Sequence, residues 1–284
     1  MNKRHSVIIL FSFIFTACTD TPHTISESHL YESVSQVVEQ ARETVDLNLL
    51  NQAKLGNAKS QRQLGVYYED NGAYSEAFYW FKKSAEQGYV IGQYNLAHCY
   101  LKGSGISKDL SKAFYWFEQA ASQNDSPAQY NLGTMYLNGE GVIKDIQKGI
   151  YWLKRSAQSN FKLALYKLGR FYHTGQYIPK NNKIALDLLK KAANQGYVPA
   201  QSYLGIILYD GVNISQNKKY GLYWIERASH SNDPNALIKM AMIYASGIDK
   251  PQDFYKAYEL AEKSCLKHKE LVACSFMREL TSPK

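Results

Sequence analysis

The sequence repeats itself with a period of 36 residues, and this period constrains the fold more than any other feature. Trp116, Trp152 and Trp224 fall on the same step, and Leu188 takes the place between the last two. A second series on this step consists of Leu96, Leu132, Leu168, Leu204 and Met240. A fixed period of this length indicates a repeat array, in which each unit buries its apolar face against its neighbours.

Each repeat contains two segments with helical periodicity. We place the repeat starts at Ser60, Gly92, Ala128, Ala164, Ala200 and Ala236. In the first segment, a tyrosine follows the repeated leucine by four residues, as Tyr136 follows Leu132, so the two side chains share one helical face. A small residue directly follows each leucine, which allows a neighbouring helix to approach closely. The pattern predicts an all-α chain of helix-turn-helix units.

The ends of both segments carry capping residues. The first segment is followed by Gly103, Gly139, Gly175, Gly211 and Gly247, with Asn71 at this place in the first repeat, which is four residues shorter. Glycine and asparagine are the residues that most readily adopt the left-handed conformation at a helix end, so we predict a positive φ at Gly139. The second segment is preceded by Asp109, Asp145, Asn181, Asn217 and Asp253, which are N-cap residue types. We interpret these residues as helix caps, and we expect the tryptophan series to be buried in the core.

The motif A-x-x-x-L-G-x-x-Y-x-x-G-x-G-V-x-x-D-x-x-K-A-x-x-W in repeats two and three resembles the Sel1-like repeat (SLR), a relative of the tetratricopeptide repeat. Repeat four lacks the tryptophan, repeat five lacks the tyrosine, and repeat six has Leu260 for the tryptophan. The resemblance implies an α/α right-handed superhelical solenoid of about six repeats with capping helices. It also implies a concave side that binds proteins or peptides, and it implies no reaction.

The domain organisation follows from these boundaries. The six repeats occupy residues 60–271, and a C-terminal capping helix and tail occupy residues 272–284. Residues 29–59 hold an amphipathic helix, His29 to Val45, and half a repeat. We expect this helix to cap the stack, and docking of a partner is the alternative.

The N-terminus has the features of an export signal. Lys3 and Arg4 precede an apolar run of nine residues, Val7 to Phe15, which is too short to span a bilayer. Phe15-Thr16-Ala17-Cys18 resembles a bacterial lipobox. The resemblance implies a signal peptide over residues 1–17, lipidation of Cys18, a flexible tether over residues 18–28, and an outer-membrane lipoprotein that faces the periplasm. Ordinary signal-peptidase cleavage, giving a periplasmic or secreted soluble protein, is the alternative.

Two of the remaining cysteines form a candidate disulfide. Cys265 ends the last repeat and Cys274 lies in the helix that follows, and the stretch resembles the helix-linking disulfides of cysteine-rich SLR proteins. An exported chain permits such a bond. Cys99 has no evident partner, and we expect a partly buried free thiol.

The candidate partner-binding groove is assigned by analogy with tetratricopeptide stacking, in which the first helices line the concave side. Its predicted residues are Tyr94, His98, Tyr130, Thr134, Asn138, Tyr166, Arg170 and His173. Tyr94, Tyr130 and Tyr166 recur at the repeat period, so their rings should line up along the groove, where they would suit an extended or acidic peptide. Packing shared by all repeats is the alternative explanation of this ladder.

Other classes of function find little support. The net charge is +8, but the basic residues are scattered, so nucleic acid is not an expected partner. No metal-ligand spacing or nucleophile motif occurs, and we expect no cofactor and no enzyme activity. The leading hypothesis is a lipid-anchored scaffold that binds a protein or peptide. The alternatives are an immunity lipoprotein that neutralises a secreted, lipase-like effector, and a weak enzyme acting on β-lactams or the cell wall.

Overall fold

The structure, a computed structural model, describes residues 46–269 and 271–281, and this part of the chain forms fourteen α-helices and no strand. The prediction of an all-α solenoid is therefore confirmed. The predicted signal peptide, lipidation at Cys18, tether and capping helix up to Val45 lie outside the described residues. The described helices are too short or too polar to cross a membrane.

Six helix pairs make up the repeats. The first helices are α4 (Ala58–Asp70), α6 (Val90–Lys102), α8 (Ser126–Asn138), α10 (Lys162–Thr174), α12 (Val198–Asp210) and α14 (Pro234–Ser246). The second helices are α5 (Tyr74–Glu86), α7 (Leu110–Ser122), α9 (Ile146–Gln158), α11 (Asn182–Asn194), α13 (Lys218–His230) and α15 (Phe254–His268). Helix α3 (Leu47–Lys54) supplies the predicted half repeat, and α16 (Leu271–Thr281) follows the last repeat. Each first helix begins two residues before the repeat start that the sequence suggested, as Ala58 does before Ser60.

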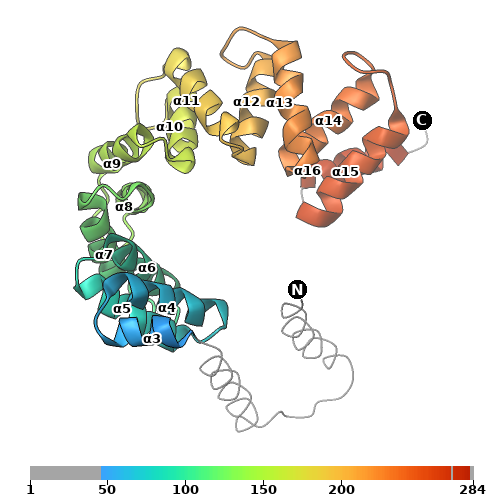
Figure 1. Cartoon of the computed structure of the whole chain (residues 1–284). Coiled ribbons are helices and arrows are strands. Elements are labelled where there is room, and N and C mark those ends of the chain that lie inside the picture. Colours follow the sequence, from blue (N-terminus) through green and yellow to red (C-terminus); the bar gives the residue numbers. More distant parts are fainter. Residues whose placement is uncertain (1–45, 270, 282–284) are drawn as a thin grey trace, which may run out of the picture.

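The helix pairs stack into a curved arc, with α3 to α7 at one end and α14 to α16 at the other (Figure 1). First helices of neighbouring repeats contact one another, as α4 does α6 and α12 does α14, more extensively than second helices do. The curvature therefore brings the first helices together on the inner side of the arc. This agrees with the predicted placement of the first helices on the concave side.

The core follows the leucine series, but the tryptophan series lies at its edge. Leu96, Leu132 and Leu168 are buried, whereas Trp80, Trp116 and Trp152 are only half-buried and Trp224 alone of the four is fully buried. The expectation that the tryptophan series is buried is therefore wrong for Trp80, Trp116 and Trp152. The most buried place belongs to the next residue along the helix, occupied by Phe81, Phe117, Leu153, Leu189 and Ile225. A step of one residue turns a side chain by about 100° around the helix, which moves the large indole to the boundary.

The caps agree with the sequence except in the first repeat. Gly139 has φ 77°, as predicted, and its N–H donates to the carbonyl of Met135 at 2.8 Å. Asp145 accepts a hydrogen bond from the amide of Lys148 at 2.9 Å and caps α9. Asn71, predicted to be left-handed, has φ −99°, and Gly72 takes that conformation with φ 76°. The shorter connection leads into α5 directly, so the left-handed residue comes one place later.

Two further features connect the helices. A Cβ at Gly133 would lie 2.9 Å from the carbonyl oxygen of Gly149, so the small residues do allow α8 and α9 to approach closely. At the C-terminal end, a disulfide joins Cys265 to Cys274 and attaches α16 to α15. Cys99 is a buried free thiol, and its burial raises its pKa to about 12.

Candidate functional site

Side chains from three consecutive first helices form one aromatic and cationic surface on the inner side of the arc. We call it the aromatic–cation cluster, and its members are Tyr130, Tyr166, Lys167, Arg170, Tyr197 and Tyr203. Tyr130 comes from α8, and the next three residues come from α10. Tyr197 is the residue before α12, and Tyr203 lies in the middle of α12. The repeat brings them together because equivalent positions of stacked first helices lie side by side.

Lys167 joins α10 to α8. Its Nζ donates to Oγ1 of Thr134 at 3.2 Å and lies 5.5 Å from the centre of the Tyr130 ring. Thr134 in turn donates to the carbonyl of Tyr130 at 3.0 Å, which fixes its hydroxyl as the acceptor for the lysine. Burial lowers the pKa of Lys167, as does the nearby Arg170, while Glu140 raises it. The half-buried ammonium group thus contacts a hydroxyl group and an aromatic ring.

Arg170 lies between two tyrosine rings. Its guanidinium carbon is 5.7 Å from the centre of the Tyr166 ring and 5.4 Å from that of Tyr203. The two rings meet edge to face, with their centres 6.1 Å apart, and Tyr197 contacts Tyr166 in the same way at 5.3 Å. Burial raises the pKa of each of these three phenols, so they remain protonated hydrogen-bond donors at neutral pH.

The two cations of the cluster lack a carboxylate partner among the residues that the structure describes. Glu140 is close enough to influence Lys167, but it accepts a hydrogen bond from Asn138 at 2.9 Å instead of pairing with it. The equivalent of Lys167 two repeats later is Lys239, which pairs with Asp210 at 2.6 Å. The inner surface is therefore neutralised at α12 and α14 but retains positive charge at α10.

The predicted groove residues of α6, Tyr94 and His98, pack against each other and against α7. The rings of Tyr94 and His98 meet at 4.6 Å, and both contact Phe117 of α7. Neither ring nitrogen of His98 has a hydrogen-bond partner among the described residues. Burial and the charge of Lys102 lower the pKa of His98 to about 4, so its ring is neutral at pH 7 and serves as an aromatic packing element.

The remaining predicted residues divide between surface and core. Tyr130, Tyr166 and Arg170 belong to the cluster, and Thr134 accepts the hydrogen bond of Lys167 beside it. Asn138 is exposed next to Glu140. His173 does not line the groove: it is only 3% exposed, and its ring nitrogens contact Oη of Tyr203 at 2.8 Å and the carbonyl of Val212 at 2.9 Å. His173 precedes by one residue the repeat position that corresponds to Asn138. This offset rotates its side chain around the helix axis, so that it points into the interface with the next repeat.

Sequence reasoning missed Tyr197 and Tyr203 as members of the site. Tyr203 occupies the same repeat position as Asn131 and Lys167, and it is the aromatic residue of these three. Tyr197 follows Phe161 at the repeat period, at the residue preceding each first helix. An aromatic residue at that place faces the tyrosine ladder of the previous repeat, as Phe161 faces Tyr130 with ring centres 5.7 Å apart. Aligning the variable positions across repeats would have revealed both.

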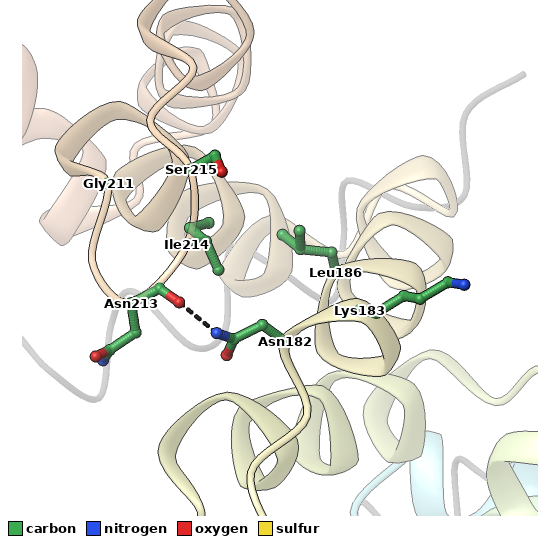
Figure 2. A pocket seen from close by; sticks show the side chains of 7 residues that line it. All are labelled: Asn182, Lys183, Leu186, Gly211, Asn213, Ile214 and Ser215. Carbon is green, nitrogen blue, oxygen red and sulfur yellow. Dashed lines mark hydrogen bonds between the residues drawn. The ribbon is translucent and has the colours of Figure 1, made fainter.

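A cavity of about 640 Å³ lies away from the cluster, between the start of α11 and the loop after α12 (Figure 2). Its lining consists of Asn182, Lys183, Leu186, Gly211, Asn213, Ile214 and Ser215. The amide of Asn182 donates to the carbonyl of Asn213 across it, while the Lys183 side chain points away. Asn213 stands where repeats two and three have Gly105 and Gly141. In the described chain, no group of His, Cys, Asp or Glu residues could hold a metal ion.

Comparison with solved structures gives two close likenesses. The first is a protective antigen of uropathogenic Escherichia coli strains with an SLR fold, 28% identical, with a TM-score of 0.74 over 82% of this chain and 51% of the antigen. The chain thus spans about half the length of that antigen. The second is a Sel1 repeat protein from Oxalobacter formigenes, 29% identical, with a TM-score of 0.71 over 86% of this chain and 98% of that one.

An immunity protein from Pseudomonas aeruginosa is also similar, at 20% identity over 73% of this chain and 74% of that protein, but its TM-score of 0.44 carries no argument about function. No curated protein matches the chain.

The family model for the Sel1 repeat matches the chain in six consecutive segments, at residues 58–89, 90–125, 126–161, 162–197, 198–233 and 234–268. Each segment begins at the first residue of a first helix and so coincides with the helix pairs of the structure. The matched segments cover most of the chain, and the protein belongs to the Sel1 repeat family.

Proposed function

We propose that the protein is a scaffold that binds an extended, acidic segment of another protein at the aromatic–cation cluster. The observation that carries this proposal is the pair of cations, Lys167 and Arg170, held between tyrosine rings without a carboxylate partner in the described chain. Arg170 is exposed, but Lys167 is half-buried, and burying a charge without a counter-ion costs stability. Such an arrangement is expected where a ligand supplies the missing negative charge.

The tyrosines define the form of the ligand. Rings of Tyr130, Tyr166 and Tyr203 come from successive repeats, so they lie along the stack. Rigid aromatic side chains with a polar end are typical of protein-binding surfaces because they lose little conformational entropy on binding. An extended segment that lies across α8, α10 and α12 can contact all three rings while its carboxylates reach the two cations.

The test is binding of a fluorescently labelled peptide of alternating Glu and Asp residues, compared with its Gln and Asn counterpart. We expect the acidic peptide to bind the full chain, and Lys167→Met with Arg170→Met to weaken it by about tenfold or more. Lys239→Met is the matched control, because Lys239 occupies the same repeat position but already pairs with Asp210. Equal binding of the neutral peptide, or an equal loss in the control, would contradict the proposal.

We further propose that the scaffold is exported and anchored to the outer membrane through lipid on Cys18, facing the periplasm. Support comes from the sequence of residues 1–18, with its positive start, short apolar run and lipobox-like end. Metabolic labelling with a palmitate analogue should label the wild-type chain and not Cys18→Ser. Labelling that persists in Cys18→Ser would contradict the lipid anchor. So would a wild-type chain whose signal peptide is cleaved but which stays unlabelled.

A further inference from the structure

A second cavity, of about 620 Å³, lies between second helices and is separate from the aromatic–cation cluster. Its lining residues are Asn194, Asn217, Lys219, Tyr220, Tyr223 and Trp224. Asn194 ends α11, and the other residues cap or belong to α13. The cavity therefore opens on the layer of second helices, whereas the cluster lies on the first helices.

Three aromatic side chains form one wall of this cavity. The rings of Tyr220 and Tyr223 are nearly parallel, with 2° between their planes and 6.2 Å between their centres. Trp224 meets both rings at steep angles and is almost fully buried, while Tyr223 is 48% exposed. Exposed aromatic faces in a concave site bind ligands with flat apolar surfaces, such as the C–H face of a pyranose ring.

This wall exists only because repeat five differs from its neighbours. In repeats two and three the position of Tyr220 is a lysine, and Lys112 and Lys148 each lie 5.5 Å from the ring of the first-helix tyrosine, Tyr100 and Tyr136. In repeat five the first-helix tyrosine is replaced by Leu208, and the lysine is replaced by Tyr220. In repeat five the aromatic ring therefore belongs to the second helix instead of the first, and it lies beside Tyr223.

Polar groups at the cavity can bind hydroxyl groups. Oδ1 of Asn217 accepts from the amide of Tyr220 at 3.0 Å, which leaves its amide nitrogen as a donor. The amide of Asn194 can both donate and accept, as a sugar hydroxyl does. Nε1 of Trp224 is a buried donor without a hydrogen-bond partner among the described residues.

Three cations surround the aromatic wall. Lys219 lines the cavity, Nζ of Lys190 lies 5.6 Å from the centre of the Tyr220 ring, and Arg227 lies 5.7 Å from that of Trp224. Arg227 also donates to Oη of Tyr223 at 3.2 Å. None of the three forms an ion pair within the described residues, and two nearby carboxylates are engaged elsewhere. These are Asp187, paired with Lys191, and Glu226, paired with Lys250. The cavity therefore favours a negatively charged ligand.

We propose that this cavity binds an acidic saccharide. A pyranose ring packs on the exposed ring of Tyr223, which Tyr220 supports, its hydroxyls exchange hydrogen bonds with the amides of Asn194 and Asn217, and its carboxylate faces Lys190 and Lys219. The site does not depend on the function proposed above, because the two surfaces share no residue and lie on different helix layers.

The experiment is a titration of the full chain with tetragalacturonate, followed by calorimetry and tryptophan fluorescence. Its fully methyl-esterified form tests the charge, and a short oligothymidylate tests for an anionic ligand of another class. We expect Tyr223→Ala and Tyr220→Lys to weaken binding of tetragalacturonate by about tenfold or more. Tyr151→Ala is the matched control, because Tyr151 has the same edge contact with Trp152 but Lys148 in place of a parallel tyrosine. We expect this control to bind like the wild type.

The remaining outcomes also decide the question. Absence of binding by the wild type, equal binding of the ester, or an equal loss in Tyr151→Ala would overturn the proposal. Tighter binding of the oligothymidylate would assign the cavity to a nucleotide and overturn it as well. Should Tyr220→Lys fail to fold, Asn194→Asp places a negative charge at the exposed end of α11 and removes one hydrogen-bond donor, so it should weaken binding of the acid more than that of the ester, and an equal loss for both would contradict the proposal.

Discussion

Gly141 in the loop after α8 packs directly on the backbone of Leu110 at the start of α7. A Cβ at Gly141 would lie only 2.2 Å from the carbonyl oxygen of Leu110, and Gly141 also has φ 70°. Gly105 packs on Tyr74 in the same way one repeat earlier. This contact ties these two loops to the preceding repeats, so it limits the spacing of neighbouring repeats there as well as the local turn.

The contact predicts a difference between two glycines with similar backbone angles. Gly72 has φ 76° and nothing within 4 Å of its added Cβ, so Gly72→Ala should cost about 1 kcal/mol from backbone strain alone. Gly141→Ala carries the same strain and also forces the loop away from Leu110, so we expect a loss of about 2 kcal/mol or more. Urea unfolding of both variants measures this, and equal losses would show that the loop contact adds nothing.

A second prediction compares Lys167 and Lys239. Lys167 is half-buried without a carboxylate partner in the described chain, so Lys167→Met should raise the free energy of unfolding by about 1 kcal/mol while it weakens binding at the cluster. Lys239→Met removes an ion pair of 2.6 Å and leaves Asp210 unpaired, so it should lower stability by about 1 kcal/mol. Chemical denaturation of the two variants should therefore give opposite signs. A destabilised Lys167→Met would show that Lys167 serves the fold.

The buried His98 predicts sensitivity to acid. Its pKa is lowered to about 4 in the folded chain from an ordinary value of 6.5, so the unfolded chain binds a proton more readily over this interval. The free energy of unfolding should therefore fall by about 2 kcal/mol between about pH 7 and about pH 5 on account of this residue. His98→Phe keeps a ring between Tyr94 and Phe117 and should remove this part of the pH dependence. Denaturation curves at both pH values test it, and parallel losses in the two proteins would contradict it.

The disulfide between Cys265 and Cys274 predicts a local effect on α16. The bond closes a loop with a sequence separation of nine residues and restricts the unfolded chain. Its removal in Cys274→Ala should destabilise docking of α16 by about 2–3 kcal/mol. Hydrogen exchange should then rise in residues 271–281 and remain unchanged in α4 to α13. Unchanged protection of α16 in the variant would show that packing alone holds this helix.

For the candidate site, Tyr130, Thr134, Tyr166 and Arg170 could be predicted from the sequence, because the repeat period and the helix period together decide which face of a first helix they occupy. The sequence could not identify Tyr203 as the partner of Arg170, since that contact joins two helices whose relative distance depends on packing. The sequence pattern also predicted, wrongly, that His173 lines the groove. An offset of one residue along α10 places this side chain in the interior instead.

The sequence by itself determined the number of repeats, the helices and almost all of their caps, because these depend on a local period and on the conformational preferences of Gly, Asp and Asn. The tertiary structure decided which side chains share a surface. Lys167 without a carboxylate partner in the described chain and Lys239 paired with Asp210 occupy the same repeat position and differ only through contacts between helices. Such contacts depend on how closely stacked repeats approach, and a period read along one chain carries no measure of that distance.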